Sequence, residues 1–210
     1  AERAYVVIDA ATRTEASGTW HSGNVEQRAD LAEAVAHFEA DAPMPHPAQT
    51  RLLVCAHGQH DQCCAVRGRP VAALLADRWS QEVWECSHLG GDRFGANVLV
   101  LPDGTYFGRL DSENAVDVVA NHLAGETDPR FLRGVTTQDP RVQAAATEVL
   151  SRLGRATAYD LSGSVLPGPE AGSVIVTVRG HPAAAVVEVL VTRRVLPPAD
   201  FGIAAAAVLP

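Results

Sequence analysis

The chain has 210 residues, of which 47% are hydrophobic, and this is enough for one large domain or for a domain with an extension. Its formal net charge of -8 argues against a nucleic-acid partner and against binding to an anionic membrane. No apolar run reaches the roughly 18 residues that a membrane span needs, so no span is expected. The adjacent Cys63 and Cys64, with no leader sequence visible, predict a reducing, cytoplasmic location.

Hydrophobic periodicity predicts alternating strands and helices over residues 4–123. Runs rich in β-branched residues indicate buried strands, and apolar residues spaced by three or four positions indicate helices. We expect strands at 4–10, 51–55, 82–86, 97–101 and 105–110, and helices at 25–40, 70–78 and 112–123. The proline-rich stretch 42–49 should be a loop, and Ser112 should cap the last of these helices. This order predicts an α/β fold whose mixed sheet ends in a hairpin.

The residues after 125 are expected to form an α+β extension that contains no cysteine. Its first part, 125–140, is polar and broken by turn-forming residues. A helix is expected next, and then three strands separated by glycine- and proline-rich turns, at 141–153, 156–161, 173–179 and 185–195. We therefore predict a first domain at 1–125 and an extension at 126–210, which can pack into the same unit.

All four cysteines and three of the eight histidines lie between residues 55 and 88. Thiolate and imidazole are soft ligands, so this concentration indicates a metal centre or a thiol redox site. Cys55 ends a predicted strand, and Cys64 follows at a distance that lets a loop close around a cluster. In a strand, Cys86 and His88 would point to the same face.

Three motifs follow one another in this region: Cys55-x-His57-x-x-x-Asp61-x-Cys63-Cys64, Ser87-His88-x-Gly90-Gly91-x-Arg93-Phe94-x-x-Asn97 and Leu101-Pro102-x-Gly104-x-Tyr106-x-Gly108. Together they resemble the sucrase/ferredoxin-like family, strongly over residues 51–110 and weakly elsewhere. The resemblance implies a thioredoxin-like domain, with a mixed sheet, that carries a 2Fe–2S cluster.

The resemblance also implies the cluster ligands, which are two cysteines eight residues apart and two histidines of a His-x-Gly-Gly-His motif. Cys55, Cys64 and His88 match three of these positions, but Asp92 stands at the fourth. Carboxylate ligation would be unusual, because thiolate and imidazole are the usual protein ligands of such clusters. We therefore expect Cys86 to be the fourth ligand, with Cys63 and Asp92 as alternatives.

The predicted function is one-electron transfer to or from a redox partner protein, by a 2Fe–2S cluster with mixed Cys/His ligation. We expect an electron carrier more than an enzyme with a substrate of its own. Two alternatives stay open. One is a thiol–disulfide oxidoreductase that uses Cys55, Cys63 or Cys64, although the Cys-x-x-Cys spacing is absent. The other is a structural zinc site with the same four ligands, in an interaction module.

Overall fold

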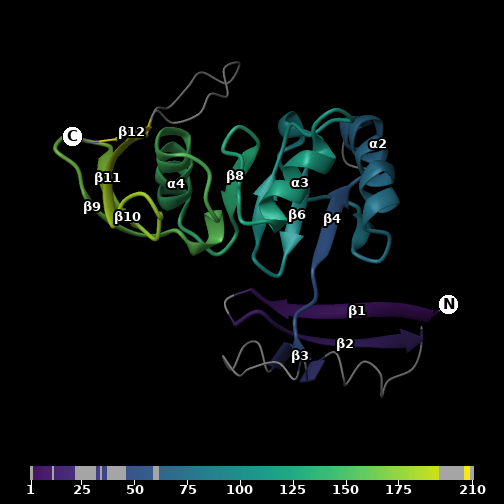
Figure 1. The fold of residues 1–210 in the computed structure, drawn as a ribbon. Coiled ribbons are helices and arrows are strands. Elements are labelled where there is room, and N and C mark those ends of the chain that lie inside the picture. Colours follow the sequence, from purple (N-terminus) through teal and green to yellow (C-terminus); the bar gives the residue numbers. More distant parts are fainter. Residues whose placement is uncertain are drawn as a thin grey trace.

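Three β-sheets and three main helices make up the described part of the chain in the computed structural model (Figure 1). The structure describes residues 2–10, 12–21, 32–33, 35–36, 46–58, 62–193 and 206–208. Most of the helix predicted at 25–40 lies outside these residues. None of the helices in the described ranges is long and apolar enough to cross a membrane.

The central sheet has five strands in the order β5-β4-β6-β7-β8. They are β4 (Arg51–Cys55), β5 (Val83–Cys86), β6 (Val98–Leu101), β7 (Thr105–Phe107) and β8 (Leu132–Val135). β4 and β5 are parallel, whereas the other neighbours are antiparallel, and β6 and β7 form the predicted hairpin. A parallel pair needs a long crossover, which the intervening helix supplies. This mixed sheet confirms the predicted α/β fold class.

The crossover helix α2 (Gln62–Arg78) begins eight residues before the predicted start at residue 70. Gly68 and Pro70, which usually weaken or end a helix, lie inside it. The helix packs on β4 and β5, and a Cβ atom built on Gly68 would lie 1.9 Å from the carbonyl oxygen of Cys55. Gly68 is therefore a close-packing residue, because any larger residue would force α2 away from the end of β4.

The next helix, α3 (Ala115–Leu123), contacts α2 and begins after Asn114. The expected cap at Ser112 is therefore wrong, because the Asp111 side chain instead accepts hydrogen bonds from the backbone amides of Glu113 and Asn114 and forms a turn there. The stretch predicted to be broken, 125–140, also contains β8, which completes the five-stranded sheet.

The C-terminal part combines α4 (Pro140–Leu153) with an antiparallel sheet of order β12-β11-β10-β9. Its strands are β9 (Ser162–Pro167), β10 (Ser173–Arg179), β11 (Val186–Thr192) and β12 (Ala206–Val208). This confirms the α+β extension, but the strand predicted at 156–161 is wrong. A short 3-10 helix, η2 (Ala158–Asp160), occupies that position, and the strand follows it.

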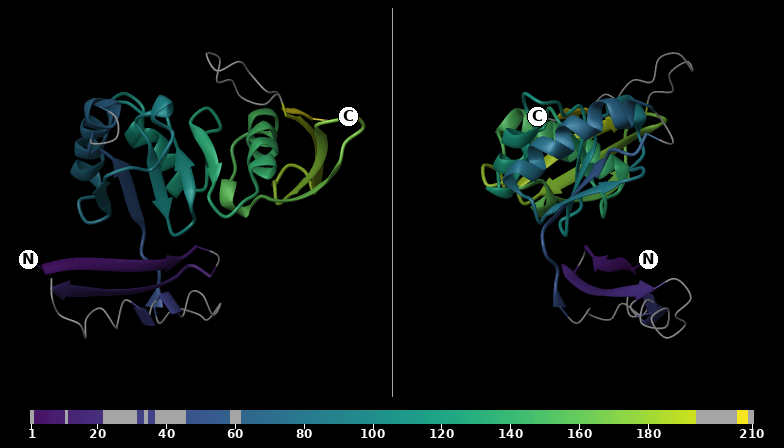
Figure 2. Two further views of the ribbon diagram at one scale, coloured as in Figure 1. Left: turned by 180° about the vertical axis from the view of Figure 1, so that it is seen from behind. Right: turned by 90° about the vertical axis from the view of Figure 1, so that its right-hand side faces the viewer.

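Helix α4 lies between the two larger sheets, packed on β8 on one side and on β9 to β12 on the other (Figures 1 and 2). Its buried residues are Val142, Ala145, Ala146, Val149 and Leu150. They belong to one hydrophobic core that extends from Leu52 in β4 to Val191 in β11. The division at residue 125 stays a prediction, and β8 and α4 connect the two sides of it.

The N-terminal strands β1 (Glu2–Asp9), β2 (Thr14–His21) and β3 (His46–Pro47) form a separate three-stranded sheet. β1 was predicted, whereas β2 was not, and β3 falls in the expected loop 42–49. Glu15 of β2 forms a buried ion pair with Arg51 of β4, including a 3.1 Å bond from Nη2 to Oε1. This pair connects the N-terminal sheet to the central sheet.

Candidate metal centre

Three of the four predicted ligands converge at the end of β4. The Sγ atoms of Cys55 and Cys64 and a ring nitrogen of His88 all lie within 4.8 Å of one another. Both cysteines are 1% exposed, and His88 is partly buried in the segment that follows β5. Two thiols and an imidazole at this separation could hold a metal ion or form part of a cluster site.

Each cysteine of this group is positioned by a regular element. Cys55 is the last residue of β4, and its amide donates to the carbonyl of Asn97 at 3.2 Å. Cys64 was expected in a loop but lies in the first turn of α2. The first turn of a helix favours negative charge, because its amides are unpaired and the helix dipole is positive there. Both thiols are therefore held by rigid backbone, and Cys64 lies in the first turn of α2, at the positive end of the helix dipole.

Cys86, the predicted fourth ligand, lies beside this group but is not one of its three members. It is the register partner of Cys55 in the parallel β4–β5 pair. Its Sγ donates to the carbonyl oxygen of Val54 at 3.4 Å. Burial, and then the nearby Cys55, raise the pKa of the Cys86 thiol to about 11. The structure thus places Cys86 next to the site, with its thiol turned toward the backbone of β4.

The two alternative fourth ligands are located only by their backbone. Cys63 lies in α2, one residue before Cys64, and Asp92 begins the short 3-10 helix η1 (Asp92–Phe94). Their side chains lie outside the described part of the structure, as do residues 59–61 with Asp61. The assignment of the fourth ligand therefore remains a prediction.

The segment after His88 is held by side chains from β7, from β8 and from Asn97, the residue before β6. Gly90 and Gly91 have φ values of +78° and +75°, which glycine adopts readily. The Tyr106 hydroxyl donates to the carbonyl of Leu89 at 2.5 Å and to that of Gly90 at 2.9 Å. Asn97 Nδ2 donates to the carbonyls of Gly90 and Gly91 at 3.2 and 3.1 Å.

Arg133 of β8 completes this group. Its Nη1 donates to the carbonyl of Gly90 at 3.0 Å and to Asn97 Oδ1 at 3.1 Å, and its guanidinium lies 4.1 Å from the centre of the Tyr106 ring. Burial raises the pKa of Tyr106 to about 12, so its hydroxyl stays a donor. We call Asn97, Tyr106 and Arg133 the loop clamp, because together they hold the backbone at 89–91.

Arg133 is the residue that the motifs missed. It lies 25 residues after the last motif residue, Gly108, in a stretch that was expected to be broken. The available signal was an arginine inside the apolar run Phe-Leu-Arg-Gly-Val at 131–135. A charge in such a run usually has a specific partner in the folded protein.

A family model described as "Sucrase/ferredoxin-like" matches residues 5–134, a range that contains all three motifs and the loop clamp. The chain belongs to the sucrase/ferredoxin-like family. This confirms the resemblance on which the ligand assignment was based. A comparison with curated proteins gave no significant match.

Among solved structures, this family member is similar to the thioredoxin-like [2Fe-2S] ferredoxin from Aquifex aeolicus. The identity is 19% and the TM-score 0.38, over 43% of this chain and 94% of that chain. Two cysteine-to-serine variants of the same ferredoxin give 19% identity and a TM-score of 0.37, over 41% of this chain and 99% of that chain. At this identity and these TM-scores, membership of the family rests on the family model.

Proposed function

We propose that this sucrase/ferredoxin-like protein is a one-electron carrier with a 2Fe–2S cluster held by cysteine and histidine. The convergence of Cys55, Cys64 and His88 within 4.8 Å is the observation that carries the proposal. The donor set fits the group, because thiolate and imidazole are the usual protein ligands of such clusters. The bound cluster would take up and release one electron, and a redox partner protein would supply or accept it.

In this proposal Cys55 and Cys64 bind one iron, and His88 and Cys86 bind the other. Cys86 is favoured as the fourth ligand because it is the register partner of Cys55. To bind, its Sγ would leave the carbonyl of Val54 and release its proton to solvent, since a ligating thiol is deprotonated. Cys63 and Asp92 are the alternatives.

The protein's own contribution would be to bury and orient the ligands. Cys55 and Cys64 are shielded from water, which limits hydrolysis and oxidation at the site. The loop clamp keeps the backbone after His88 in place, and this would limit how far His88 can move from the two thiols.

A structural zinc site is a second candidate, favoured by the same short distances between the ligand atoms of Cys55, Cys64 and His88. With Zn–S bonds of about 2.3 Å, ligands around one tetrahedral ion lie about 3.8 Å apart. Three donors within 4.8 Å of one another are close to that arrangement. A thiol–disulfide role for Cys55, Cys63 or Cys64 is the third candidate.

Anaerobic purification of the intact chain tests all three. The proposal predicts red-brown protein with about two iron and about two acid-labile sulfide per chain, reduced and reoxidised reversibly by one electron. Colourless protein with one zinc would support the structural site instead. Colourless, metal-free protein whose Cys55 and Cys64 form a reversible disulfide would support the thiol–disulfide role.

A further inference from the structure

An arginine-rich face lies beside the candidate metal centre, although the chain as a whole is acidic. It is formed around the partly buried Phe94 by five arginines from α2, η1, β8 and the loops next to β7 and β8: Arg67, Arg93, Arg109, Arg130 and Arg133. Three of their guanidinium groups lie 4.7 to 5.6 Å from the centre of the Phe94 ring, those of Arg93, Arg109 and Arg133. All 17 basic residues of the chain are arginine, a residue that binds carboxylates through two parallel hydrogen bonds.

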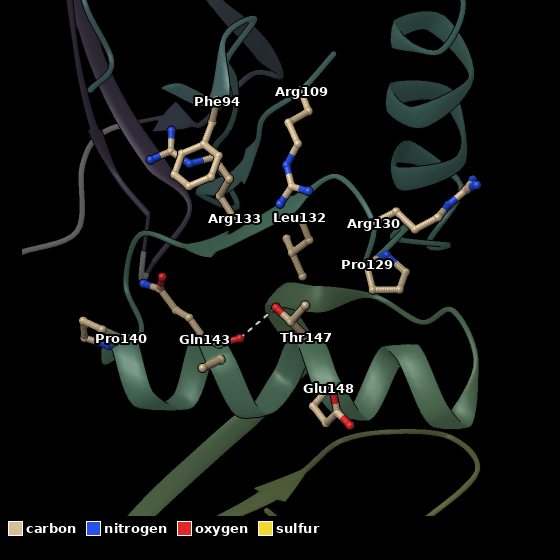
Figure 3. Close-up of a pocket in the computed structure, with 11 residues that line it drawn as sticks. Phe94, Arg109, Pro129, Arg130, Leu132, Arg133, Pro140, Gln143, Thr147 and Glu148 are labelled. Carbon is tan, nitrogen blue, oxygen red and sulfur yellow. Dashed lines mark hydrogen bonds between the residues drawn. The ribbon is translucent and has the colours of Figure 1, made fainter. Parts of the chain in front are cut away.

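Two hollows open on this face, and Arg109 lines both. The larger has a volume of about 460 Å³ and lies between Phe94, β8 and α4 (Figure 3). Figure 3 shows the Arg109 side chain extending toward Leu132, with Arg133 beside Phe94. The second hollow, of about 380 Å³, is lined by Arg67, Val66 and Asp111 among others. Val66 is 71% exposed, so the face also offers an apolar contact.

Arg109 has an unusual backbone conformation. Its φ is +61°, and among the described residues only Arg13 is another non-glycine with positive φ. The Arg109 amide donates a hydrogen bond to the carbonyl oxygen of Phe94, with an N to O distance of 2.6 Å. Such a conformation is strained for a residue with a side chain, and strained positions of this kind are concentrated at functional sites.

The acidic side chains that the structure describes on this face pair with groups other than Arg109. Asp111, which lines the second hollow, accepts hydrogen bonds from the backbone amides of Glu113 and Asn114. Glu148 lines the larger hollow but is paired with Arg152, and Asp128 is paired with both Arg130 and Arg155. Arg109 forms no ion pair with any residue that the structure describes. Its charge is therefore available to an incoming carboxylate.

We propose that this face is the docking surface for an acidic region of the redox partner, with Arg109 as its central contact. The inference rests on the proposed electron-transfer function and adds the charge of the partner. The two segments that carry the proposed ligands Cys64 and His88 each contact an arginine of this face or contain one. Arg67 follows Cys64 by one helical turn and donates to the carbonyl of Gly95 at 3.3 Å, and Arg133 binds the carbonyl of Gly90 in the segment after His88.

The first test measures binding without reference to the cluster. A fluorescein-labelled peptide of about ten glutamates is titrated with the intact chain, and anisotropy is followed at low and high salt. We expect binding that weakens with salt, by the screening of exposed charges. Arg109→Ala should weaken it roughly threefold, Arg109→Glu should abolish it, and Arg109→Lys should largely retain it.

Arg179→Glu is the matched control, because Arg179 is an exposed arginine of β10 in the C-terminal sheet. It makes the same change in net charge as Arg109→Glu but should leave peptide binding unchanged. Equal losses in the two variants would overturn the proposal, as would tighter binding of a lysine peptide than of the glutamate peptide. Arg109→Gly removes the charge and also relieves the backbone strain, so weaker binding in this well-folded variant excludes misfolding as the cause.

The second test uses the reduced, cluster-loaded protein and two small oxidants of opposite charge. The cluster gives one electron to hexacyanoferrate(III) or to hexaamminecobalt(III), and the rate is followed by absorbance. A net charge of -8 acting alone would repel the anion, so its rate would rise with salt. A positive docking face predicts the reverse, a rate that falls with salt and falls again in Arg109→Ala.

The two tests separate the proposals from each other. If the purified chain holds no cluster, the oxidation test cannot be run and the electron-transfer proposal fails, yet the peptide test still reports on the face. If the cluster reacts faster with the anion as salt rises, and Arg109→Ala changes nothing, the docking proposal fails and the electron carrier stands.

Discussion

Cys55 and Cys86 are opposite each other in the parallel β4–β5 pair, and the amide after Cys55 donates to the Cys86 carbonyl at 3.2 Å. The two strands therefore bring two thiols to one end of the central sheet. Only Cys55 belongs to the group of converging donors, since the thiol of Cys86 faces the carbonyl of Val54. Substitutions at Cys86 thus decide the ligand assignment.

Cys86→Ser should leave protein that folds but holds less iron. A serine hydroxyl is a poorer ligand than a thiolate, so we expect iron and sulfide to fall by at least about half and the visible spectrum to shift. Cys63→Ser is the matched control, one residue from Cys64, and should keep wild-type iron. Full iron in Cys86→Ser with loss in Cys63→Ser would move the fourth ligand to Cys63.

His88→Cys should lower the midpoint potential of the cluster. Replacing a neutral imidazole by a thiolate adds negative charge, which disfavours the reduced state. Clusters with two histidines lie at about -150 to +300 mV, against about -400 mV for all-cysteine plant-type ferredoxins. A redox titration followed by electron paramagnetic resonance gives both values, and an unchanged potential would falsify ligation by His88.

Tyr106→Phe removes one donor of the loop clamp and keeps the ring. Its hydroxyl is hydrogen-bonded to the carbonyls of Leu89 and Gly90. Removing it should lower the free energy of unfolding by about 1 to 3 kcal/mol. We also expect faster loss of the cluster, because the segment after His88 is less well held. Thermal unfolding of the metal-free chain measures the first effect, and bleaching of the visible absorbance measures the second. Tyr159→Phe, outside the clamp, is the control, and an equal bleaching rate in both variants would contradict this role.

Gly68→Ala should disturb the candidate metal centre by moving α2 relative to β4. The added methyl group would meet the Cys55 carbonyl, so α2 must shift away from β4 and carry Cys64 with it. Overpacking of this kind costs about 1 to 3 kcal/mol. Denaturant unfolding and iron analysis should both show a loss. Ala73→Leu, on the exposed side of the same helix, should show neither loss. Unchanged stability and iron content in Gly68→Ala would mean that α2 packs less closely on β4 than this argument requires.

Glu15 should make stability depend on pH through its pair with Arg51. The side-chain hydrogen bonds from Arg51 hold the pKa of Glu15 below its usual range. A lowered folded-state pKa contributes stability that is complete above the unfolded pKa of about 4.3 and is lost as the pH falls through the folded value. Glu15→Gln should therefore cost about 1 to 3 kcal/mol at pH 7, because the buried Arg51 keeps an acceptor but loses its charged partner, and less at pH 3.

Urea unfolding of the wild type and of Glu15→Gln at several pH values checks this dependence. Glu148→Gln serves as the comparison, since the i,i+4 pair of Glu148 with the exposed Arg152 should contribute only about 0.5 kcal/mol. A constant difference between wild type and Glu15→Gln from pH 7 to pH 3 would rule out the pair as its source.

The parts of the fold that could be predicted from sequence are those with a clear apolar period. β4 and β10 have the predicted bounds, because both are short apolar runs flanked by polar residues. The resemblance to the sucrase/ferredoxin-like family implied Cys55, Cys64 and His88 as ligands, and the fold brings these three side chains together. β2 could not be predicted, because its small and polar residues carry no such period.

The remaining differences come from tertiary packing that outweighs local preference. Gly68 and Pro70 indicate a break in the helix, but close contact with β4 makes the glycine a requirement. The fourth ligand could not be predicted from spacing, because it depends on the direction of the Cys86 side chain. Arg133 was missed since its partners, the carbonyl of Gly90 and the side chain of Asn97, lie on distant segments.

The position of α4 makes the C-terminal sheet part of the support for the metal centre. Because β8 carries Arg133 on the central sheet and packs against α4, the clamp on the His88 segment depends on a helix whose other side is covered by β9 to β12. A chain shortened after β8 would remove the packing of α4 on this strand. The backbone that carries Arg133 would then be less well supported. The extension therefore supports the segment after His88 through α4, β8 and Arg133, so that a substitution in the C-terminal sheet can weaken the candidate metal centre.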